Sequence, residues 1–252
     1  MTFIPHTAMV MAAGKGTRMR PLTNDRPKPL VAVCGETLLD HVLGHLRDGG
    51  VNRIVVNVHY LADMVEAHLA AHATDFDIAI SDERGALLET GGGLMQARSL
   101  LGPAPFFCVN TDNIWTDDAQ DDAAANAFTR LAASWDDARM DVLMLLVPRA
   151  RAFHHAGHGD FEMDEAGRLS REDRASQKPW VWTGIQLLHP RILLDPPGDA
   201  FSTNIFWDRA IAAGRCFGIV HHGDWYDVGT PDAIPVVEAG LGYFANVEPV
   251  ST

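Results

Sequence analysis

The sequence is poor in cysteine and in positive charge. It has three cysteines in 252 residues, Cys34, Cys108 and Cys216, and no CxxC pair. An odd, widely spaced set of this kind indicates reduced core thiols in a cytoplasmic protein rather than a disulfide framework. The 20 Lys and Arg residues face 33 Asp and Glu residues, which gives a net charge of −13. This charge disfavours nucleic acid or an anionic membrane as the main partner.

Long hydrophobic runs are also missing. The N-terminal segment lacks a basic region, and the apolar run over residues 8–13 is too short for a signal peptide or a membrane span. We find no transmembrane candidate elsewhere. What the chain does have is 47% hydrophobic residues, enough for a sizeable core. The length is compatible with one large α/β domain over residues 1–252. A monomer and a small homo-oligomer are both compatible with the sequence.

Expected strands alternate with expected helices from the N-terminus. Apolar runs predict strands, helical spacing of apolar residues predicts helices between them, and this alternation predicts a parallel sheet with helices on both faces. Residues 161–170 have the composition of a hairpin, and the run 180–189 is a long strand, so the middle section leans toward antiparallel pairing. The strands are expected at 8–13, 53–58, 77–80, 105–109, 141–148 and 216–220, and the helices at 39–46, 61–69, 94–101, 128–135 and 205–211.

A glycine-rich, basic stretch follows the first expected strand. Residues 10–28 read VMAAGKGTRMRPLTNDRPK and carry five Lys or Arg residues and one acid, a net charge of +4 in an acidic chain. Gly14 and Gly16 let the backbone approach a ligand, and the free N–H groups of such a turn form an anion site. The carboxyl ends of parallel strands are where ligands bind. The stretch is therefore predicted to bind a small polyanion.

Two common phosphate motifs do not fit this stretch. No GxxxxGK sequence followed by Ser or Thr is present, which excludes a P-loop. In a dinucleotide-binding GxGxxG motif, Met19 would occupy the position of the third glycine, which is needed for close helix–strand packing. A nicotinamide-dependent dehydrogenase is therefore the weaker alternative.

Two further stretches carry polar residues beside glycines or strand ends. Leu87 to Gly93 reads LLETGGG, where Thr90 is expected to cap the helix that begins near residue 94. Asp112 follows the expected strand at 105–109, where a carboxylate can hold Mg²⁺ together with ligand phosphates, although Asp is also a common turn residue. The pairs His154-His155 and His221-His222 are candidate zinc ligands. Neighbouring residues on a strand point to opposite faces, however, and no Cys or carboxylate set completes such a site, so a zinc site is not expected.

Three motifs in order, GKGTRMRPLTNDRPKPL, VNTD and WYDVGT, resemble the signature of sugar-1-phosphate nucleotidylyltransferases. The resemblance runs from Met9 to about Leu241. It implies the nucleotide-diphospho-sugar transferase fold, a Rossmann-like three-layer αβα sandwich with a mixed, mainly parallel sheet. It also implies a nucleotide-binding half over residues 8–112, a sugar-binding half over 141–230, and no C-terminal β-helix.

The resemblance gives individual residues roles. It implies that Arg18 contacts the triphosphate and that Lys28 bridges the attacking phosphate and the α-phosphate. It implies Mg²⁺ as cofactor, held by Asp112 and Asp227; either aspartate is otherwise a plain strand-end residue. The nucleotide contacts it implies are Ala12, Ala13, Gly14, Lys15, Gly16, Glu89, Thr90, Gly91 and Asn110, and the sugar contacts are Gly159, Trp182, Thr183 and Gly184.

The chain departs from the family pattern at two positions. Thr111 stands where glycine is more frequent, and Trp182 stands where asparagine often precedes the Thr-Gly pair. An aromatic ring at 182 can either stack on a sugar or fill the core.

Within the family, the strings PLVAVCGETLLDHVL, LLETGGG and TGIQLLHP are most similar to enzymes that transfer UMP from UTP to N-acetylmuramate 1-phosphate. Guanylyltransferases of mannose 1-phosphate share much of the pattern, and the residues themselves do not choose between the bases. A non-catalytic nucleotide-sugar sensor is the alternative from another class.

Overall fold

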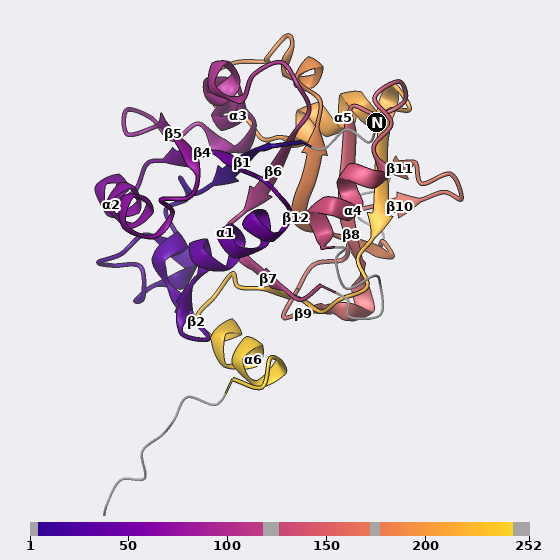
Figure 1. The fold of residues 1–252 in the computed structure, drawn as a ribbon. Coiled ribbons are helices and arrows are strands. Elements are labelled where there is room, and N and C mark those ends of the chain that lie inside the picture. The colour runs from indigo at the N-terminus through magenta and orange to yellow at the C-terminus, as the bar shows by residue number, and fades with distance from the viewer. Residues whose placement is uncertain (1–4, 118–125, 172–176, 244–252) are drawn as a thin grey trace, which may run out of the picture.

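The centre of the molecule is a seven-stranded sheet, seen in the computed structural model, which describes residues 5–117, 126–171 and 177–243 (Figure 1). The strand order is β13-β8-β12-β6-β1-β4-β5. Only β12 runs antiparallel to its neighbours, so the sheet is mixed and mainly parallel as expected. Its strands are β1 (Thr7–Met11), β4 (Arg53–Val58), β5 (Asp77–Asp82), β6 (Phe106–Asn110), β8 (Val142–Pro148), β12 (Trp180–Leu188) and β13 (Cys216–Val220).

Helices cover both faces of this sheet, because successive side chains of a strand point to opposite faces. In β8, Leu143 and Leu145 lie in one core, whereas Met144 and Leu146 lie in the other. The first core is covered by three helices, α1 (Leu38–Asp48), α2 (Ala62–His72) and α4 (Ala127–Ser134). The second is covered by α3 (Glu89–Leu101) and α5 (Asn204–Ala212). The expected three-layer αβα sandwich is thus confirmed.

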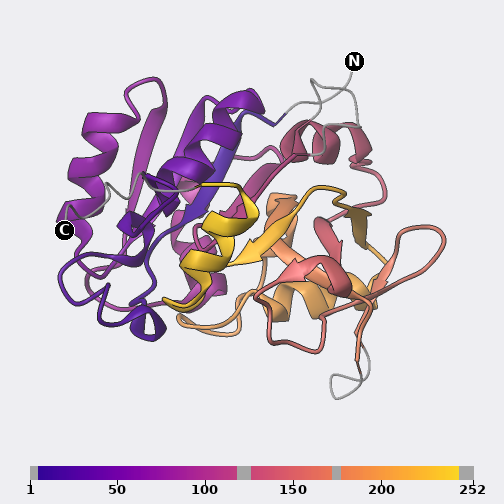
Figure 2. The ribbon, with the colours of Figure 1, turned by 90° about the horizontal axis from the view of Figure 1, so that it is seen from below.

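Smaller elements pack around the central sheet. Helix α6 packs against β14 and β2 through a third apolar core that contains Val33, Tyr226 and Val237 (Figures 1 and 2). Helix α6 spans Ala233–Gly240. A three-stranded sheet joins β7 (Asn113–Trp115), β14 (Trp225–Asp227) and β9 (Ala152–Phe153). Two hairpins pair β2 (Ala32–Val33) with β3 (Glu36–Thr37) and β10 (Glu162–Met163) with β11 (Leu169–Ser170). Short 3₁₀ helices occupy Thr17–Met19, Lys28–Leu30, Arg149–Arg151 and Pro190–Leu193.

The start of α3 differs from the sequence expectation. The helix begins at Glu89 rather than near residue 94, so the three glycines lie inside it and Thr90 does not cap it. The glycines allow close packing: a Cβ at Gly91 would lie 2.5 Å from the Phe201 ring, and one at Gly92 would lie 2.2 Å from the Asp199 carbonyl oxygen. The expected cap is therefore wrong, and the glycines let α3 approach the segment that leads into α5.

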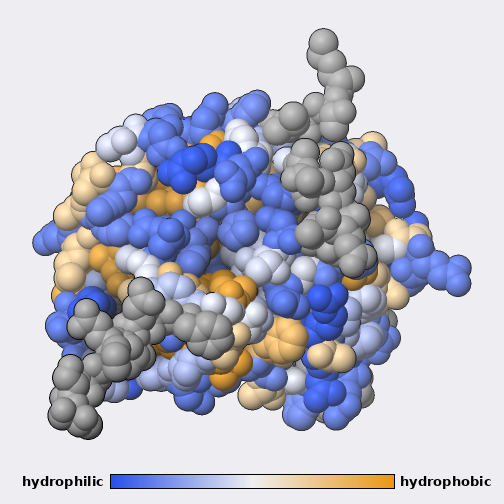
Figure 3. Space-filling view, turned by 60° about the horizontal axis from the view of Figure 1, so that its bottom comes forward, coloured by the Kyte–Doolittle hydropathy of each residue, from blue (hydrophilic) through white to orange (hydrophobic). Residues whose placement is uncertain are grey.

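The face of the molecule seen in Figure 3 is mainly hydrophilic. Large apolar side chains with more than a third of their area exposed are scattered along the chain, and Figure 3 shows hydrophobic patches of small size on a mainly hydrophilic face. Within the described residues, every helix is too short or too polar to cross a bilayer.

Candidate active site

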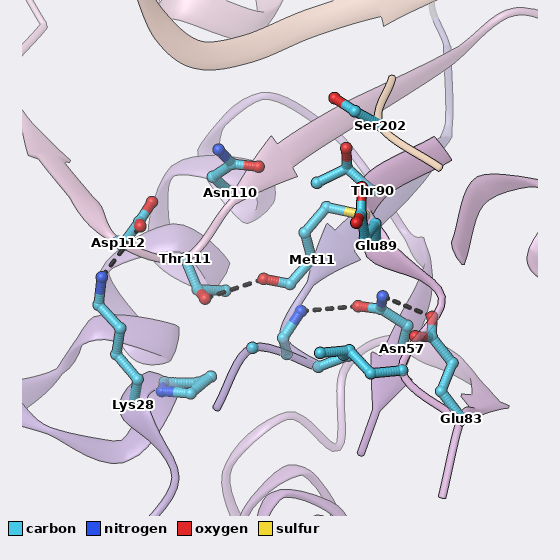
Figure 4. A pocket seen from close by; sticks show the side chains of 15 residues that line it. Met11, Lys28, Asn57, Glu83, Glu89, Thr90, Asn110, Thr111, Asp112 and Ser202 are labelled. Atoms are coloured by element: carbon cyan, nitrogen blue, oxygen red, sulfur yellow. Dashed lines mark hydrogen bonds and ion pairs between the residues drawn. The ribbon is translucent and has the colours of Figure 1, made fainter. Parts of the chain in front are cut away.

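A cavity of about 420 Å³ opens at the carboxyl-terminal ends of β1, β4, β5 and β6. Parallel strands place their C-terminal residues at one edge of the sheet, and the first turn of α3 and the 3₁₀ helix at Lys28–Leu30 complete the wall (Figure 4). The lining residues are Met11, Ala12, Ala13, Gly14, Lys28, Pro29, Asn57, Glu83, Leu87, Glu89, Thr90, Asn110, Thr111, Asp112 and Ser202.

The glycine-rich loop forms one side of this cavity. Ala12, Ala13 and Gly14 line it, whereas Lys15 and Gly16 lie outside the lining. Gly16 has a φ of 60°, and a Cβ there would lie 2.9 Å from the Cβ of Lys28, so glycine lets the loop fold back onto the lysine-bearing turn. The close approach fixes where Lys28 enters the site.

A buried polar pair forms the floor of the cavity. The Asn57 Oδ1 atom accepts a hydrogen bond of 2.7 Å from the Ala12 N–H, and its Nδ2 atom donates one of 2.8 Å to Glu83 Oε1 (Figure 4). Glu83 is 2% exposed, and burial raises the pKa of its carboxyl group against the opposing effect of the Asn57 bond. Sequence reasoning missed both residues. The available signal was Asn57, a polar residue in the otherwise apolar strand RIVVNV.

Lys28 and Asp112 face each other across the cavity mouth. The Lys28 Nζ atom lies 2.9 Å from Asp112 Oδ2, and the lysine side chain is 12% exposed against 32% for the aspartate. Thr111 donates a hydrogen bond of 2.9 Å from its hydroxyl to the Met11 carbonyl (Figure 4). The threonine that replaces the frequent glycine thus ties the end of β6 to the end of β1 and holds the Asp112 backbone.

The fold brings Asp227 next to Asp112. Strand β14 pairs antiparallel with β7 so that Asp227 is opposite Asn113, and the Val228 N–H donates to the Asp112 carbonyl at 2.9 Å. His155 Nδ1 lies 3.5 Å from Asp227 Oδ2. The two carboxylates predicted as metal ligands therefore lie at one rim of the site, Asp227 at the end of β14 and Asp112 in the bend directly before β7.

Arg18 reaches the same rim from the glycine-rich loop. A Cβ at Gly229 would lie 3.0 Å from Asp227 Oδ1 and 3.4 Å from Arg18 Nη1, so the carboxylate and the guanidinium flank one point of the backbone. Arg18 is exposed and lies outside the cavity lining, in the 3₁₀ helix Thr17–Met19. The arrangement gathers two cations and two carboxylates around the cavity mouth.

The donor set at this rim fits Mg²⁺. Mg²⁺ binds through one or two carboxylates plus substrate phosphates and several waters rather than in a full protein cage. Asp112 and Asp227 supply that number of carboxylates, and each side chain is partly exposed, at 32% and 27%. No group of three or more His, Cys, Asp or Glu side chains suited to a metal ion exists among the described residues, which leaves the remaining coordination positions to ligand oxygens.

The residues at the start of α3 divide into two sets. Glu89, which has a φ of 59°, and Thr90 line the cavity, and the Thr90 hydroxyl accepts a hydrogen bond of 2.9 Å from the Thr203 N–H. Gly91 is buried outside the lining, and its N–H donates to the Phe201 carbonyl at 2.8 Å. Of the three predicted contacts in this loop, Glu89 and Thr90 therefore face the cavity and Gly91 does not.

A second cavity of about 290 Å³ adjoins the first. Trp182 lines it, and its ring meets the Trp207 ring edge-on with a centroid distance of 4.6 Å. The Trp182 indole N–H also donates to the Ile185 carbonyl at 3.1 Å. Trp182 thus has its own packing partner and also faces open space. Both cavities share Met11, Thr90, Asn110 and Ser202 in their linings.

The other predicted sugar-contact residues have different positions. Thr183 is fully buried and donates to the Leu145 carbonyl at 2.9 Å, so its hydroxyl is used within the sheet. Gly159 lies outside the second cavity and lines a neighbouring one. Gly184, with a φ of 84°, sits at the irregularity between β12 and β8, where a Cβ would lie 2.3 Å from the Asn113 Nδ2 atom. Gly184 lets β12 approach β7, whose first residue, Asn113, follows Asp112.

We expect Gly184→Ala to destabilise the protein by about 2–4 kcal/mol, since it adds a clash with Asn113 to the left-handed strain of a non-glycine residue. Gly50→Ala is the matched control, because Gly50 has a φ of 76° but open space around its Cβ position, and it should lose only about 1 kcal/mol. Urea unfolding measures both changes. Equal losses in the two variants would remove the steric explanation for Gly184.

Fold and site together define an α/β protein with a cavity at the carboxyl ends of its parallel strands and charged groups at the mouth of that cavity. The nucleotidyl transferase family model matches residues 7–241. The chain belongs to the nucleotidyl transferase family and is a nucleotidyltransferase, as the three sequence motifs had predicted.

Individual relatives cover the chain to different extents. The chain is 44% identical over 244 residues to N-acetylmuramate alpha-1-phosphate uridylyltransferase of Caulobacter vibrioides, with 96% of this chain and 99% of that protein covered. It is 27% identical to mannose-1-phosphate guanylyltransferase catalytic subunit beta of Dictyostelium discoideum, with 95% and 64% covered. Among solved structures, inositol-1-phosphate CTP transferase from T. maritima has a TM-score of 0.77 at 16% identity, with 96% of this chain and 97% of that chain covered. That structure supports the fold alone.

Proposed function

We propose that this protein transfers UMP from UTP to N-acetylmuramate α-1-phosphate, giving UDP-N-acetylmuramate and pyrophosphate. The observation that carries the proposal is the identity of 44% to a uridylyltransferase of that substrate over nearly the full length of both chains. The two adjoining cavities with charged groups at their mouth support it, because the reaction needs room for a nucleotide and for a sugar. The product belongs to the recycling of cell-wall sugars. UTP and the three free thiols favour a cytoplasmic site for the reaction.

The chemistry is an in-line displacement. An oxygen of the sugar 1-phosphate attacks the α-phosphorus of UTP, the bond to the β-phosphate breaks, and pyrophosphate leaves. The attacking phosphate has a second pKa of about 6, so it is mostly ionised at neutral pH and needs no general base. Catalysis then depends on holding the two anions together and balancing their charge.

The chain supplies that balance from three places. We assign the first cavity, of about 420 Å³, to the nucleotide and call it the nucleotide cavity. Lys28 lies at its mouth, where the ammonium group reaches the two reacting phosphates. Arg18, on the rim beside Gly229, contacts the triphosphate and the departing pyrophosphate. The backbone of residues 12–14 lines the cavity and contacts the base and the phosphates. Lys15, Gly16 and Gly91 lie outside the lining; Gly16 and Gly91 shape their loops through close approaches to Lys28 and Phe201.

Asp112 and Asp227 would hold Mg²⁺ at the rim of the cavity. When bound, the ion neutralises charge on the phosphates and orients them. The chain's part is to keep the end of β14 beside the bend that carries Asp112, through the bond between the Val228 N–H and the Asp112 carbonyl.

A guanylyltransferase of mannose 1-phosphate is the second candidate. It is favoured by the identity of 39% over 110 residues to the mannose-1-phosphate guanylyltransferase catalytic subunit beta of Xenopus tropicalis, a match that covers 42% of this chain and 31% of that protein. The partial coverage makes it the weaker candidate.

The test is pyrophosphate release by the purified protein with Mg²⁺. UTP, GTP, dTTP and CTP are each combined with the 1-phosphates of N-acetylmuramate, N-acetylglucosamine, glucose and mannose. We expect release with UTP and N-acetylmuramate 1-phosphate. Release with GTP and mannose 1-phosphate would move the protein to the second candidate. Nucleotide binding without pyrophosphate release for any combination of NTP and sugar 1-phosphate would identify a sensor. Binding of NADH that NTP does not affect would favour the dehydrogenase alternative.

A further inference from the structure

A third cavity, of about 230 Å³, neighbours the second cavity, to which we assign the acceptor sugar (the sugar cavity). Asp160, Asn204 and Trp207 line both cavities, so these side chains lie between a sugar in the second cavity and the space of the third. The third cavity is also lined by Gly159, Phe161, Arg171 and Lys178. The lining holds the Asp160 carboxylate and two cations, and each cation also pairs with a carboxylate outside the lining, Arg171 with Asp208 and Lys178 with Glu162.

Lys178 is an unusual residue for such a place. Its side chain is 4% exposed, and its Nζ atom lies 2.8 Å from Glu162 Oε1, whose side chain is 56% exposed. A buried ammonium group is costly unless anions surround it. Among the described residues Glu162 is its ion-pair partner, and an ammonium group can donate three hydrogen bonds, so a ligand carboxylate in the cavity can serve as a second partner.

Arg171 is held rigidly beside it. Its guanidinium donates to the side-chain and backbone oxygens of Asn204 at 2.8 Å and 2.7 Å and to Asp208 Oδ1 at 2.8 Å. It also lies 5.5 Å from the centroid of the Trp207 ring. Because these contacts fix the guanidinium before a ligand binds, little side-chain entropy is lost on binding.

We propose that Arg171 and Lys178 bind a carboxylate carried by the acceptor sugar, and so select N-acetylmuramate 1-phosphate over N-acetylglucosamine 1-phosphate. The inference rests on the proposed function. The two sugars differ at one position, where N-acetylmuramate carries a lactyl ether that ends in a carboxylate and N-acetylglucosamine has a hydroxyl group. The lactyl group is the only anionic substituent on the sugar besides the phosphate, and the third cavity is where a cationic lining meets the sugar cavity.

The test compares kcat/KM for the two sugar 1-phosphates with UTP in the wild type and in Lys178→Met, which keeps the apolar stem. We expect kcat/KM for N-acetylmuramate 1-phosphate to fall about 10- to 100-fold, as for loss of a hydrogen bond to a charged group, and that for N-acetylglucosamine 1-phosphate to stay unchanged. Arg168→Met is the matched control, because Arg168 is 52% exposed on the β10–β11 hairpin outside the cavity. It should leave the ratio of the two substrates unchanged.

A substrate variant makes the test independent of folding. The lactyl amide of N-acetylmuramate 1-phosphate removes the charge from the ligand, and with the wild type it should lose about as much kcat/KM as Lys178→Met does. Full activity with the amide, or equal losses for both sugars in Lys178→Met, would overturn the carboxylate subsite while leaving the proposed function intact. If the wild type does not use N-acetylmuramate 1-phosphate at all, the proposed function fails and the inference fails with it.

Discussion

Replacing Lys28 with methionine should lower kcat by about 10²- to 10³-fold, the loss seen when one preorganised group that balances transition-state charge is removed. The Lys28 ammonium is the cation that lines the nucleotide cavity, and it is held at the mouth by Asp112. Charge moves onto the pyrophosphate and the α-phosphate oxygens during the displacement, so the cation is worth more in the transition state than with bound substrates. Steady-state pyrophosphate release measures the change.

The same substitution should barely affect stability. The ion pair that is lost joins side chains that are 12% and 32% exposed; methionine keeps the apolar stem of Lys28 and Asp112 stays partly hydrated, so we expect a loss of about 1 kcal/mol, the upper end for surface pairs. Thermal unfolding of the variant should therefore resemble that of the wild type. Arg26→Met is the matched control, since Arg26 lies two residues away, is 50% exposed and pairs with Asp25. A Lys28→Met enzyme with wild-type turnover would remove Lys28 from the mechanism.

Much of the fold follows from local patterns in the sequence. Strand β4 is an apolar run bounded by polar residues, and it was predicted over its full length, because a buried parallel strand leaves that signature. The alternation of such runs with amphipathic segments predicted the layers. Residues 89–93 were misread, because glycine inside a helix costs about 1 kcal/mol relative to alanine, and the contacts of Gly91 and Gly92 with residues 199–201 lie more than 100 positions away in sequence.

The site was predictable only where a motif carried it. Asp112 and Asp227 lie 115 positions apart (227 minus 112), and only the pairing of β7 with β14 joins them. The Asn57–Glu83 pair was missed, because a single polar residue in an apolar strand does not say which side chain it meets on the neighbouring strand. Lys178 and Arg171 gave no signal either, since sequence does not distinguish a buried cation from a solvated one.

Substitution of Asp112 or Asp227, the two carboxylates at the rim, should change the Mg²⁺ dependence of the reaction. We expect Asp112→Asn and Asp227→Asn each to lower kcat by about 10²- to 10³-fold, because loss of a metal ligand removes several kcal/mol of charge stabilisation. Each asparagine preserves the shape of the side chain and the backbone bond between Val228 and Asp112. Pyrophosphate release at increasing Mg²⁺ concentration should show activity in the variants only at higher metal concentration than in the wild type.

Binding of Mn²⁺ gives a readout that does not depend on turnover. With an unreactive UTP analogue present, electron paramagnetic resonance should show weaker Mn²⁺ binding in both variants than in the wild type. Asp224→Asn is the control, because Asp224 lies three residues before Asp227 but its carboxylate pairs with Arg151, 3.1 Å away. Wild-type Mn²⁺ affinity in one of the two variants would remove that aspartate from the metal site. Wild-type affinity in both would mean that the charge of the phosphates is balanced by Lys28 and Arg18 alone.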